Sequence, residues 1–391
     1  MSRNRTKKSC LPYSSTQINK KKLTVSIPSY RPTVVILDGY FKARLHTEVF
    51  MNFRGSHIIS VDQLNRVSVE KIFDVADSMT PYASRLQTTK VLDGAILGSM
   101  FFEASTRTRM SFGCAFNSLG GSVREIVDMK TSSISKGESL YDTARVISGY
   151  SDVIVMRHPS PGSVEEFAKA SRVPVINGGD GDNEHPSQAL LDLYTIRKEL
   201  EHKKSMIDGM RIAMVGDLKN GRTVHSLSKL LLLYKNITFT MISPNELKMP
   251  NEILDQLILA GHKVIETDNM KVGLSDNDTV YLTRIQEERF EKQSDADLYR
   301  GQFKLNQEIY TQHCAPNTVI MHPLPRDSRA NANELDSDLN LHPNLAIFRQ
   351  ADNGVVIRMA LFALVLGVED SVHKTSAPVK WFTDTRTTTT T

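Results

Sequence analysis

Short apolar segments alternate with helix-length segments through most of this chain, and that alternation limits the folds available to it. Residue patterning predicts strands at Ala95–Phe102, Asp152–Met156, Val173–Asn177, Arg211–Val215, Ile237–Ile242, Thr279–Thr283 and Thr318–Met321. The segments between them repeat apolar residues every three or four positions, as amphipathic helices do. Strands alternating with helices are typical of parallel sheets covered by helices on both faces. Since the pattern extends over about 320 residues, we predict an α/β protein of two domains, each a parallel sheet with helices on both faces.

The composition is that of a globular protein without membrane spans. Among 391 residues, 40% are hydrophobic and 24% are charged, which excludes wholesale disorder. The longest apolar runs, at Leu230–Leu233 and Ala360–Val368, are far shorter than the roughly 20 residues of a spanning helix. The three cysteines, Cys10, Cys114 and Cys314, lack CxxC spacing. We therefore expect neither a disulfide framework nor a zinc site, no membrane partner, and a cytoplasmic location.

The first 50 residues differ from the rest in charge. They carry a net charge of +8, whereas the remainder carries −4. A solvated tail is the favoured interpretation; an organellar transit segment, which would place the protein in an organelle, and a nucleic-acid-binding arm are the alternatives. Because the body is mildly acidic, we expect no nucleic-acid partner. The threonine-rich end, Thr383–Thr391, is also predicted to be a tail.

The first predicted strand leads into a segment suited to an anion. In open α/β sheets, ligands bind beyond the carboxyl ends of the strands. After Phe102 come hydroxyl side chains and two arginines, Arg107 and Arg109, and then an amphipathic helix that Ser105 or Thr106 can cap. Hydroxyls, arginines and the free N–H groups of a helix N-terminus would converge here. The segment predicts a phosphate-binding turn.

The later strand ends carry further polar groups. Arg157 follows the second strand, and a glycine-rich exit from the third leads to His185 and Gln188, which face one side of a first helical turn. The remaining exits contribute Arg222, Arg284, Gln286 and the segment His322-Pro323-Leu324-Pro325-Arg326. The prolines predict a stiff loop whose backbone carbonyls can accept hydrogen bonds from an amide.

This set of residues excludes several chemistries. The exit after Val215 lacks GxGxxG, so it does not predict a dinucleotide site. No P-loop, HExxH motif, serine triad order or cysteine paired with a histidine occurs in the sequence. We therefore predict a site that holds a polyanion and stabilises negative charge developing on oxygen, without a covalent intermediate and without a metal.

Three segments, in this order, resemble the motifs of the carbamoyltransferase family: Ser105-Thr106-Arg107-Thr108-Arg109, His185-Pro186-Ser187-Gln188 and His322-Pro323-Leu324-Pro325-Arg326. The resemblance covers about residues 56–370 and is strongest to the members that use L-aspartate. It implies transfer of the carbamoyl group of carbamoyl phosphate to the amine of L-aspartate, a step of pyrimidine biosynthesis, with no cofactor. An enzyme acting on ornithine and an inactive paralogue serving as a scaffold are the alternatives. Pro323 and the pair Arg284 and Gln286 favour the dianionic acceptor.

The resemblance also implies a role for each site residue. Carbamoyl phosphate would be held by Ser105, Thr106, Arg107, Thr108, Arg157, His185, Gln188, Pro323 and Leu324. L-Aspartate would be held by Lys136, Arg222, Arg284 and Gln286. The residues expected to take part in catalysis are Arg107, Thr108, Arg157, His185 and Lys136. Glu103 would pair with Arg222 and Arg289 when both substrates bind, closing the two domains over them.

The implied organisation has a discontinuous first domain. A basic extension (1–55) would precede a carbamoyl-phosphate domain (56–203 plus about 345–372), with an aspartate domain (204–344) inserted and a C-terminal tail (373–391). In the family, the lysine matching Lys136 comes from a neighbouring chain, which implies a homotrimer with shared active sites. Either Ser132 or Ser133 would accompany it. The sequence leaves open regulatory chains or a larger assembly, and segment 327–340 departs from the family pattern.

Overall fold

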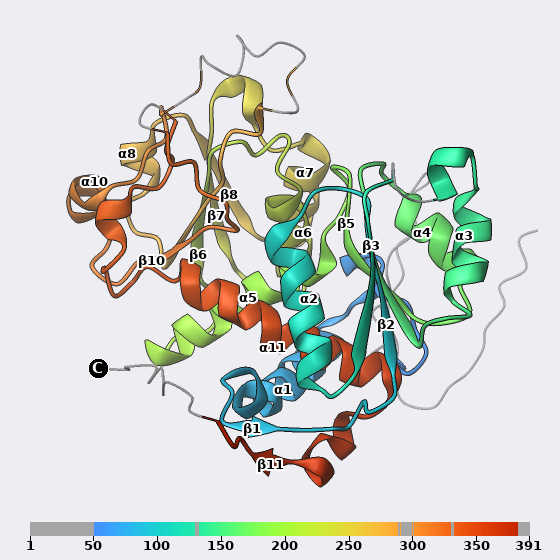
Figure 1. The fold of residues 1–391 in the computed structure, drawn as a ribbon. Helices are drawn as coiled ribbons and strands as arrows, with labels where there is room; N and C mark the ends of the chain where they lie inside the picture. The colour runs from blue at the N-terminus through green and yellow to red at the C-terminus, as the bar shows by residue number, and fades with distance from the viewer. Residues whose placement is uncertain are drawn as a thin grey trace, which may run out of the picture. The chain divides into compact units, whose positions relative to one another are not determined.

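A computed structural model describes residues 51–129, 133–287, 290, 299, 301–329 and 332–381, all within one compact unit. The predicted basic extension lies almost wholly outside the described residues, as does the threonine-rich end. No helix in the described ranges is both long enough and apolar enough to span a membrane. The structure contains two parallel sheets, drawn in Figure 1, so the predicted fold class is confirmed. The domain boundaries stay a prediction.

The first sheet has four parallel strands in the order β3-β2-β4-β5. Their bounds are Ile96–Phe101 (β2), Ser122–Val127 (β3), Val153–His158 (β4) and Val175–Asp180 (β5). Alternate residues of β4 enter different cores, because successive side chains of a strand point to opposite faces. Val153 and Val155 pack in the large core that includes α1 (Arg66–Ala83), α2 (Thr106–Ser118) and α5 (Pro186–His202). Ile154 and Met156 pack instead with α3 (Leu140–Ile147) and α4 (Ser163–Ala170).

The second sheet has five parallel strands in the order β10-β9-β6-β7-β8. Their bounds are Arg211–Val215 (β6), Thr238–Ile242 (β7), Lys263–Thr267 (β8), Thr279–Leu282 (β9) and Val319–Met321 (β10). Met214 faces the large core with α6 (Arg222–Leu231) and α7 (Asn251–Leu259). Val215 faces a separate core with α8 (Met270–Gly273) and α10 (Gln307–His313). Helices therefore cover both faces here too.

Helix α11 (Ile347–Leu366) connects the end of the second sheet to the helices of the first. At its start, the N–H of Ala346 donates to the carbonyl of Ile320 in β10 (2.8 Å). Further along, the Phe362 ring lies edge-on to Phe112 and Phe116 of α2. The chain therefore returns to the first sheet after completing the second (Figure 1). A two-residue antiparallel pair follows, formed by β1 (Gln87–Thr88) and β11 (Ala377–Pro378).

Sequence patterning missed β3 and β8, and both lie at sheet edges. Their side chains are mostly exposed or half-buried, and neither strand contains a fully buried residue. Strands in the middle of a parallel sheet form continuous apolar runs because both faces are covered. Of the four edge strands of these two sheets, β3 and β8 lack such a run, whereas β5 and β10 are fully buried, so composition does not separate β3 and β8 from loops.

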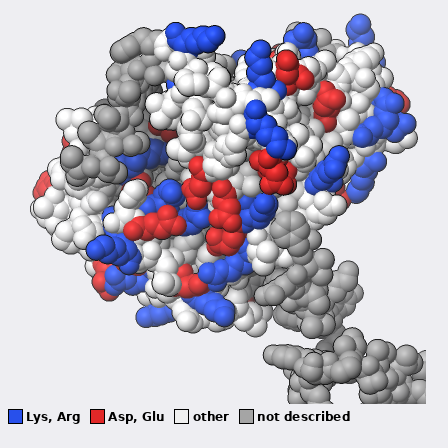
Figure 2. Space-filling model, turned by 90° about the horizontal axis from the view of Figure 1, so that it is seen from below, with Lys and Arg blue, Asp and Glu red and all other residues white. Residues whose placement is uncertain are grey.

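Charged side chains of both signs are interspersed on the face drawn in Figure 2, so its described part carries no extended region of one sign.

Candidate active site

The strand ends of both sheets border a single cavity of about 860 Å³. Most of the predicted site residues line it: Glu103, Ser105, Thr106, Arg107, Thr108, Arg157, His185, Gln188, Arg222, Arg284, Gln286, Pro323 and Leu324. These residues come from distant parts of the sequence, and the carboxyl ends of the parallel strands bring them together. The strand ends that were predicted to share a site therefore border the same cavity.

The predicted phosphate-binding turn forms the start of α2. Ser105 is the residue that precedes the helix, and its hydroxyl caps none of the described N–H groups. The first N–H groups of a helix have no partner within the helix, and they attract anions. Arg107 lines the cavity, and partial burial lowers the pKa of its guanidinium. The expectation that Arg109 joins it is wrong: Arg109 does not line the cavity, and its Nε lies 3.9 Å from Glu125 of β3.

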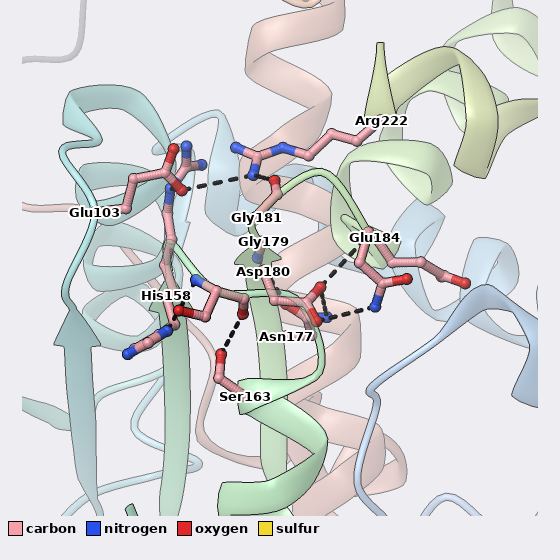
Figure 3. Close-up of polar contacts among 12 residues, drawn as sticks. Glu103, His158, Ser163, Asn177, Gly179, Asp180, Gly181, Glu184 and Arg222 are labelled. Atoms are coloured by element: carbon pink, nitrogen blue, oxygen red, sulfur yellow. Dashed lines mark hydrogen bonds and ion pairs between the residues drawn. The ribbon is translucent and has the colours of Figure 1, made fainter. Parts of the chain in front are cut away.

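Glu103 links two arginines across the cavity. Its Oε2 accepts a hydrogen bond from Arg157 Nε (3.1 Å) and lies 3.5 Å from Arg222 Nη1. Arg222 also donates to the carbonyl of Gly181 (Figure 3). We predicted that Glu103 pairs with Arg222 and Arg289 in the closed enzyme, and the structure places Glu103 beside Arg222. Arg289, the other predicted partner, lies outside the described residues.

His185 sits at the start of α5 and is 3% exposed. Burial, and then the charges of Arg222, Arg157 and Arg358, hold the pKa of this imidazole well below its usual value of 6.5. His185 is therefore neutral at physiological pH. A buried neutral imidazole can donate one N–H to a carbonyl oxygen without carrying a charge of its own.

The loop that delivers His185 is organised by Asp180, which sequence reasoning did not single out. Asp180 is buried at the end of β5. Its carboxylate accepts hydrogen bonds from Asn177 Nδ2 (3.0 Å) and the Glu184 N–H (3.2 Å) (Figure 3). It also accepts from the Gly162 N–H (2.9 Å). An aspartate that binds nearby backbone N–H groups stabilises a turn. The run of aspartates and glycines after β5 was the available signal.

On the second sheet, the predicted residues are already bonded to protein groups. Gln286 Nε2 donates to the carbonyl of Asn220 (2.9 Å), and the Gln286 N–H donates to the buried carboxylate of Asp217 (3.2 Å). Asp217 also accepts from the N–H of Asn220 (3.0 Å). Arg284 Nη1 donates to the carbonyl of Ile285 (3.2 Å). Asp217 therefore fixes two exits of this sheet to each other, a role that its place in the sequence did not reveal.

The loop after β10 is held by His322. The His322 side chain is almost fully buried, and its Nδ1 accepts from the Leu324 N–H (2.8 Å) while its Nε2 lies 2.7 Å from Glu334. Leu324 has a φ of 55°, in the left-handed region that non-glycine residues rarely adopt. These contacts bend the segment so that Pro323 and Leu324 line the cavity.

Beneath the cavity lies a buried carboxyl group that sequence reasoning missed. Asp192 is 0% exposed, and burial raises its pKa to about 7 although Tyr281, Gln350, Gln188 and the charge of Arg358 all act to lower it. Gln350 and Arg358, both on α11, line the cavity. No spacing within the sequence marked Asp192 together with Gln350, because the Asp192 partners Tyr281 and Gln350 are more than 80 residues away.

Lys136 does not line the cavity of its own chain. It ends a short 3₁₀ turn, Ser133–Lys136, and is exposed to solvent, as is Ser133. Ser132, the alternative companion, lies outside the described residues. No cluster of His, Cys, Asp or Glu suited to a metal ion occurs among the residues whose positions are given.

Comparison with known proteins assigns both halves of the chain to the same family. Residues 56–198 match the family model "Aspartate/ornithine carbamoyltransferase, carbamoyl-P binding domain", and residues 208–365 match its "Asp/Orn binding domain". The chain is 66% identical over 336 residues to the aspartate carbamoyltransferase catalytic subunit of Cellvibrio japonicus, covering 86% of this chain and 99% of that protein.

Solved structures of aspartate transcarbamoylases are similar to this chain in fold. The catalytic subunit of aspartate transcarbamoylase from M. jannaschii superposes with a TM-score of 0.72 at 42% identity, covering 81% of this chain and 99% of that one. The Trypanosoma cruzi aspartate transcarbamoylase, in complex with carbamoyl phosphate and aspartate, gives a TM-score of 0.73 at 36% identity, covering 80% and 98%.

Proposed function

Since the chain belongs to the aspartate/ornithine carbamoyltransferase family, we propose that it transfers the carbamoyl group of carbamoyl phosphate to the amine of L-aspartate. The products are N-carbamoyl-L-aspartate and phosphate, as in de novo pyrimidine biosynthesis. One observation carries the proposal: Arg107 and Arg157 line the cavity from the first sheet, and Arg222 and Arg284 line it from the second. A cavity with cations on both sides suits two anionic reactants.

Carbamoyl phosphate binds on the side of the first sheet. Its phosphate occupies the start of α2, where Ser105, Thr106, Arg107 and Thr108 supply hydroxyls, a guanidinium and backbone N–H groups. Its NH2 group donates to Gln188 and to the carbonyls of Pro323 and Leu324. Its carbonyl oxygen then faces Thr108, Arg157 and His185.

These three groups drive the chemical step. The amine of aspartate attacks the carbamoyl carbon, and negative charge develops on the carbonyl oxygen. The Arg157 guanidinium and the neutral N–H of His185 stabilise that charge in a buried setting, where such interactions are strong. The bond between the carbamoyl carbon and the phosphate oxygen then breaks, and the phosphate leaves with the proton that the amine gives up. Alignment of the two reactants contributes up to about 7–11 kcal/mol of the barrier reduction.

L-Aspartate binds on the side of the second sheet. Its carboxylates pair with Arg222 and Arg284, which can bind a carboxylate through two parallel hydrogen bonds, and with Gln286. Ornithine would present a cationic side chain to the same arginines. The like charges favour aspartate over ornithine as the acceptor.

An assay of purified protein tests this function. We expect carbamoyl phosphate and L-aspartate to give N-carbamoyl-L-aspartate and an equal amount of phosphate. Formation of citrulline when L-ornithine replaces L-aspartate would favour the ornithine-specific alternative. Absence of product with either amine, from folded protein, would favour the inactive scaffold.

We also propose a homotrimer in the cytoplasm in which Lys136 completes the site of a neighbouring subunit. Support comes from the exposure of Lys136 away from its own cavity. A lysine on an exposed turn can reach a phosphate or carboxylate on an adjacent chain. Ring closure by three copies would give every site one such lysine.

Mixing two inactive variants tests the shared site. Lys136→Ala and Arg157→Ala proteins are dissociated, mixed and reassembled. If the two residues of one site come from different chains, each mixed trimer regains about one working site in three, by counting neighbours around the ring. Activity that stays at the level of the parents after confirmed reassembly would rule out sharing.

A further inference from the structure

The carboxyl group of Asp192 joins three elements beneath the cavity. It lies on α5, one turn after Gln188, and is 0% exposed. Its Oδ1 accepts hydrogen bonds from Gln188 Nε2 (2.9 Å) and from Gln350 Nε2 of α11 (2.6 Å). Its Oδ2 accepts from the hydroxyl of Tyr281 in β9 (2.7 Å). One buried group thus receives a donor from each of α5, α11 and β9.

The neighbours of Gln350 fix the direction of these bonds. The backbone N–H of His322 donates to Gln350 Oε1 (3.0 Å). A backbone N–H can only donate, so the oxygen of the Gln350 amide must face His322 and its NH2 must face Asp192. Asp192 Oδ1 is therefore an acceptor.

The same logic sets the orientation of Gln188. A side-chain amide can turn over at little cost when its surroundings accept either end. The Asp192 oxygen that accepts from Gln350 Nε2 also accepts from Gln188 Nε2, so the NH2 end of Gln188 faces Asp192. The oxygen of the Gln188 amide then points away from Asp192, and Gln188 lines the cavity. Gln188 therefore presents a hydrogen-bond acceptor, and not a donor, to the cavity.

Burying a charged group between helices costs free energy. Transfer of an ionised carboxylate out of water is unfavourable unless it is well hydrogen-bonded. Here three donors and the nearby guanidinium of Arg358 reduce that cost, although burial still raises the pKa of Asp192 to about 7. A neutral amide at this position would keep one acceptor oxygen for Gln350 and Gln188, so the informative change is to remove the acceptor itself.

We propose that Asp192 is a positioning residue that sets the preference of the cavity for an acyl phosphate bearing an NH2 group. It acts through two residues. It turns the oxygen of Gln188 towards the substrate, and through Gln350 it holds the segment from His322 to Leu324, whose carbonyls also accept from that NH2 group. The inference rests on the proposed function, because it concerns the carbamoyl end of the same site.

Acetyl phosphate provides the probe, since it replaces the NH2 group with a methyl group and leaves the phosphate unchanged. Dissociation constants of carbamoyl phosphate and acetyl phosphate are measured by calorimetry for the wild type, Asp192→Leu and Gln350→Met. We expect carbamoyl phosphate to bind about five- to tenfold more weakly to both variants, as for the loss of a hydrogen bond, with acetyl phosphate unchanged. The ratio of the two constants is the readout, because a merely structural role would weaken both ligands alike.

Asn353→Ala is the matched control. It removes a different hydrogen bond between α11 and α5, from Asn353 Nδ2 to Thr195 Oγ1 (2.9 Å), without touching Asp192. We expect it to keep the ratio of the wild type. An equal fall of the ratio in Asn353→Ala would overturn the proposal, because helix spacing would then explain the effect.

Two further results bear on the proposal. A ratio that is unchanged in either Asp192→Leu or Gln350→Met, with thermal unfolding showing folded protein, would overturn it. If Asp192→Leu does not fold, Gln350→Met decides alone. Failure of the proposed function is a separate outcome, recognised by the absence of carbamoyl-aspartate formation by the wild-type protein.

Discussion

The two sides of the cavity present their polar groups in different states. On the side of the first sheet, α2 begins with N–H groups that have no partner within the helix, and the hydroxyl of Ser105 caps none of those described. On the side of the second sheet, Gln286 donates to Asn220, and Arg222 donates to Gly181 and lies beside Glu103. A phosphate bound at the start of α2 therefore meets N–H groups that have no partner within the helix. A dicarboxylate bound on the second side must replace hydrogen bonds that Gln286 and Arg222 make within the protein.

This difference suggests how each side contributes to the free energy of substrate binding. The first side gains affinity because its groups are organised in advance. The second side exchanges one set of hydrogen bonds for another, so aspartate gains less free energy for each contact. We therefore expect carbamoyl phosphate to bind the protein without aspartate, and aspartate to bind more weakly. The predictions below probe each side in turn.

The largest effect should follow from a change on the first side, at His185. We expect His185→Ala to lower kcat by about 10²–10³-fold, as for removal of one donor to a developing oxyanion. The control is His262→Asn, which alters a buried histidine of the second sheet that does not line the cavity. It should keep kcat near that of the wild type.

The pH dependence of kcat also tests the role of His185. Because burial lowers the pKa of His185 well below 6.5, its protonation should reduce activity only at pH values far below that figure. A limb of the kcat profile centred near 6.5 that disappears in His185→Ala would show that this histidine titrates normally. That result would contradict its role as a neutral donor.

A smaller effect is expected on the second side, at Arg284. Arg284→Ala should weaken the binding of aspartate by about 1.5–3 kcal/mol, since it removes a charge-assisted pair with a carboxylate. The KM for carbamoyl phosphate should change little. Arg326→Ala is a suitable control, because Arg326 follows the neighbouring strand but does not line the cavity. Equal weakening of both substrates by Arg284→Ala would refute the division of roles.

The smallest change in stability is expected at the contact between the two sides. Glu103→Gln should lower kcat and aspartate affinity, because Glu103 holds both Arg157 and Arg222. Its ion pairs are partly exposed, so the free energy of unfolding should change by less than about 1 kcal/mol. Steady-state kinetics and thermal unfolding measure the two effects. Kinetics identical to the wild type would remove Glu103 from the mechanism.

Sequence reasoning recovered the parts of the molecule whose signal is local. The central strands and the cavity-lining strand ends were predicted because buried strands and the motifs after them are continuous in sequence. The edge strands β3 and β8 were missed because their faces are not fully buried. Asp192 was missed because its partners Tyr281 and Gln350 are distant in sequence, and only the fold brings them together.

The motif after β2 contains two arginines, and only one of them lines the cavity. Arg107 and Arg109 are two residues apart, so on a helix they cannot face the same way. Arg107 lines the cavity and Arg109 turns towards Glu125. The helical periodicity was visible in the sequence and would have separated the two.

The central claim is that each side of the cavity binds its own reactant, and equilibrium binding of carbamoyl phosphate in the absence of aspartate tests it most directly. Calorimetry would compare the wild type with Arg107→Ala, on the first side, and Arg284→Ala, on the second. We predict at least about tenfold weaker binding to Arg107→Ala, as for loss of a charge-assisted phosphate contact, and binding close to the wild type for Arg284→Ala. Equal loss in both variants, or loss only in Arg284→Ala, would contradict the account.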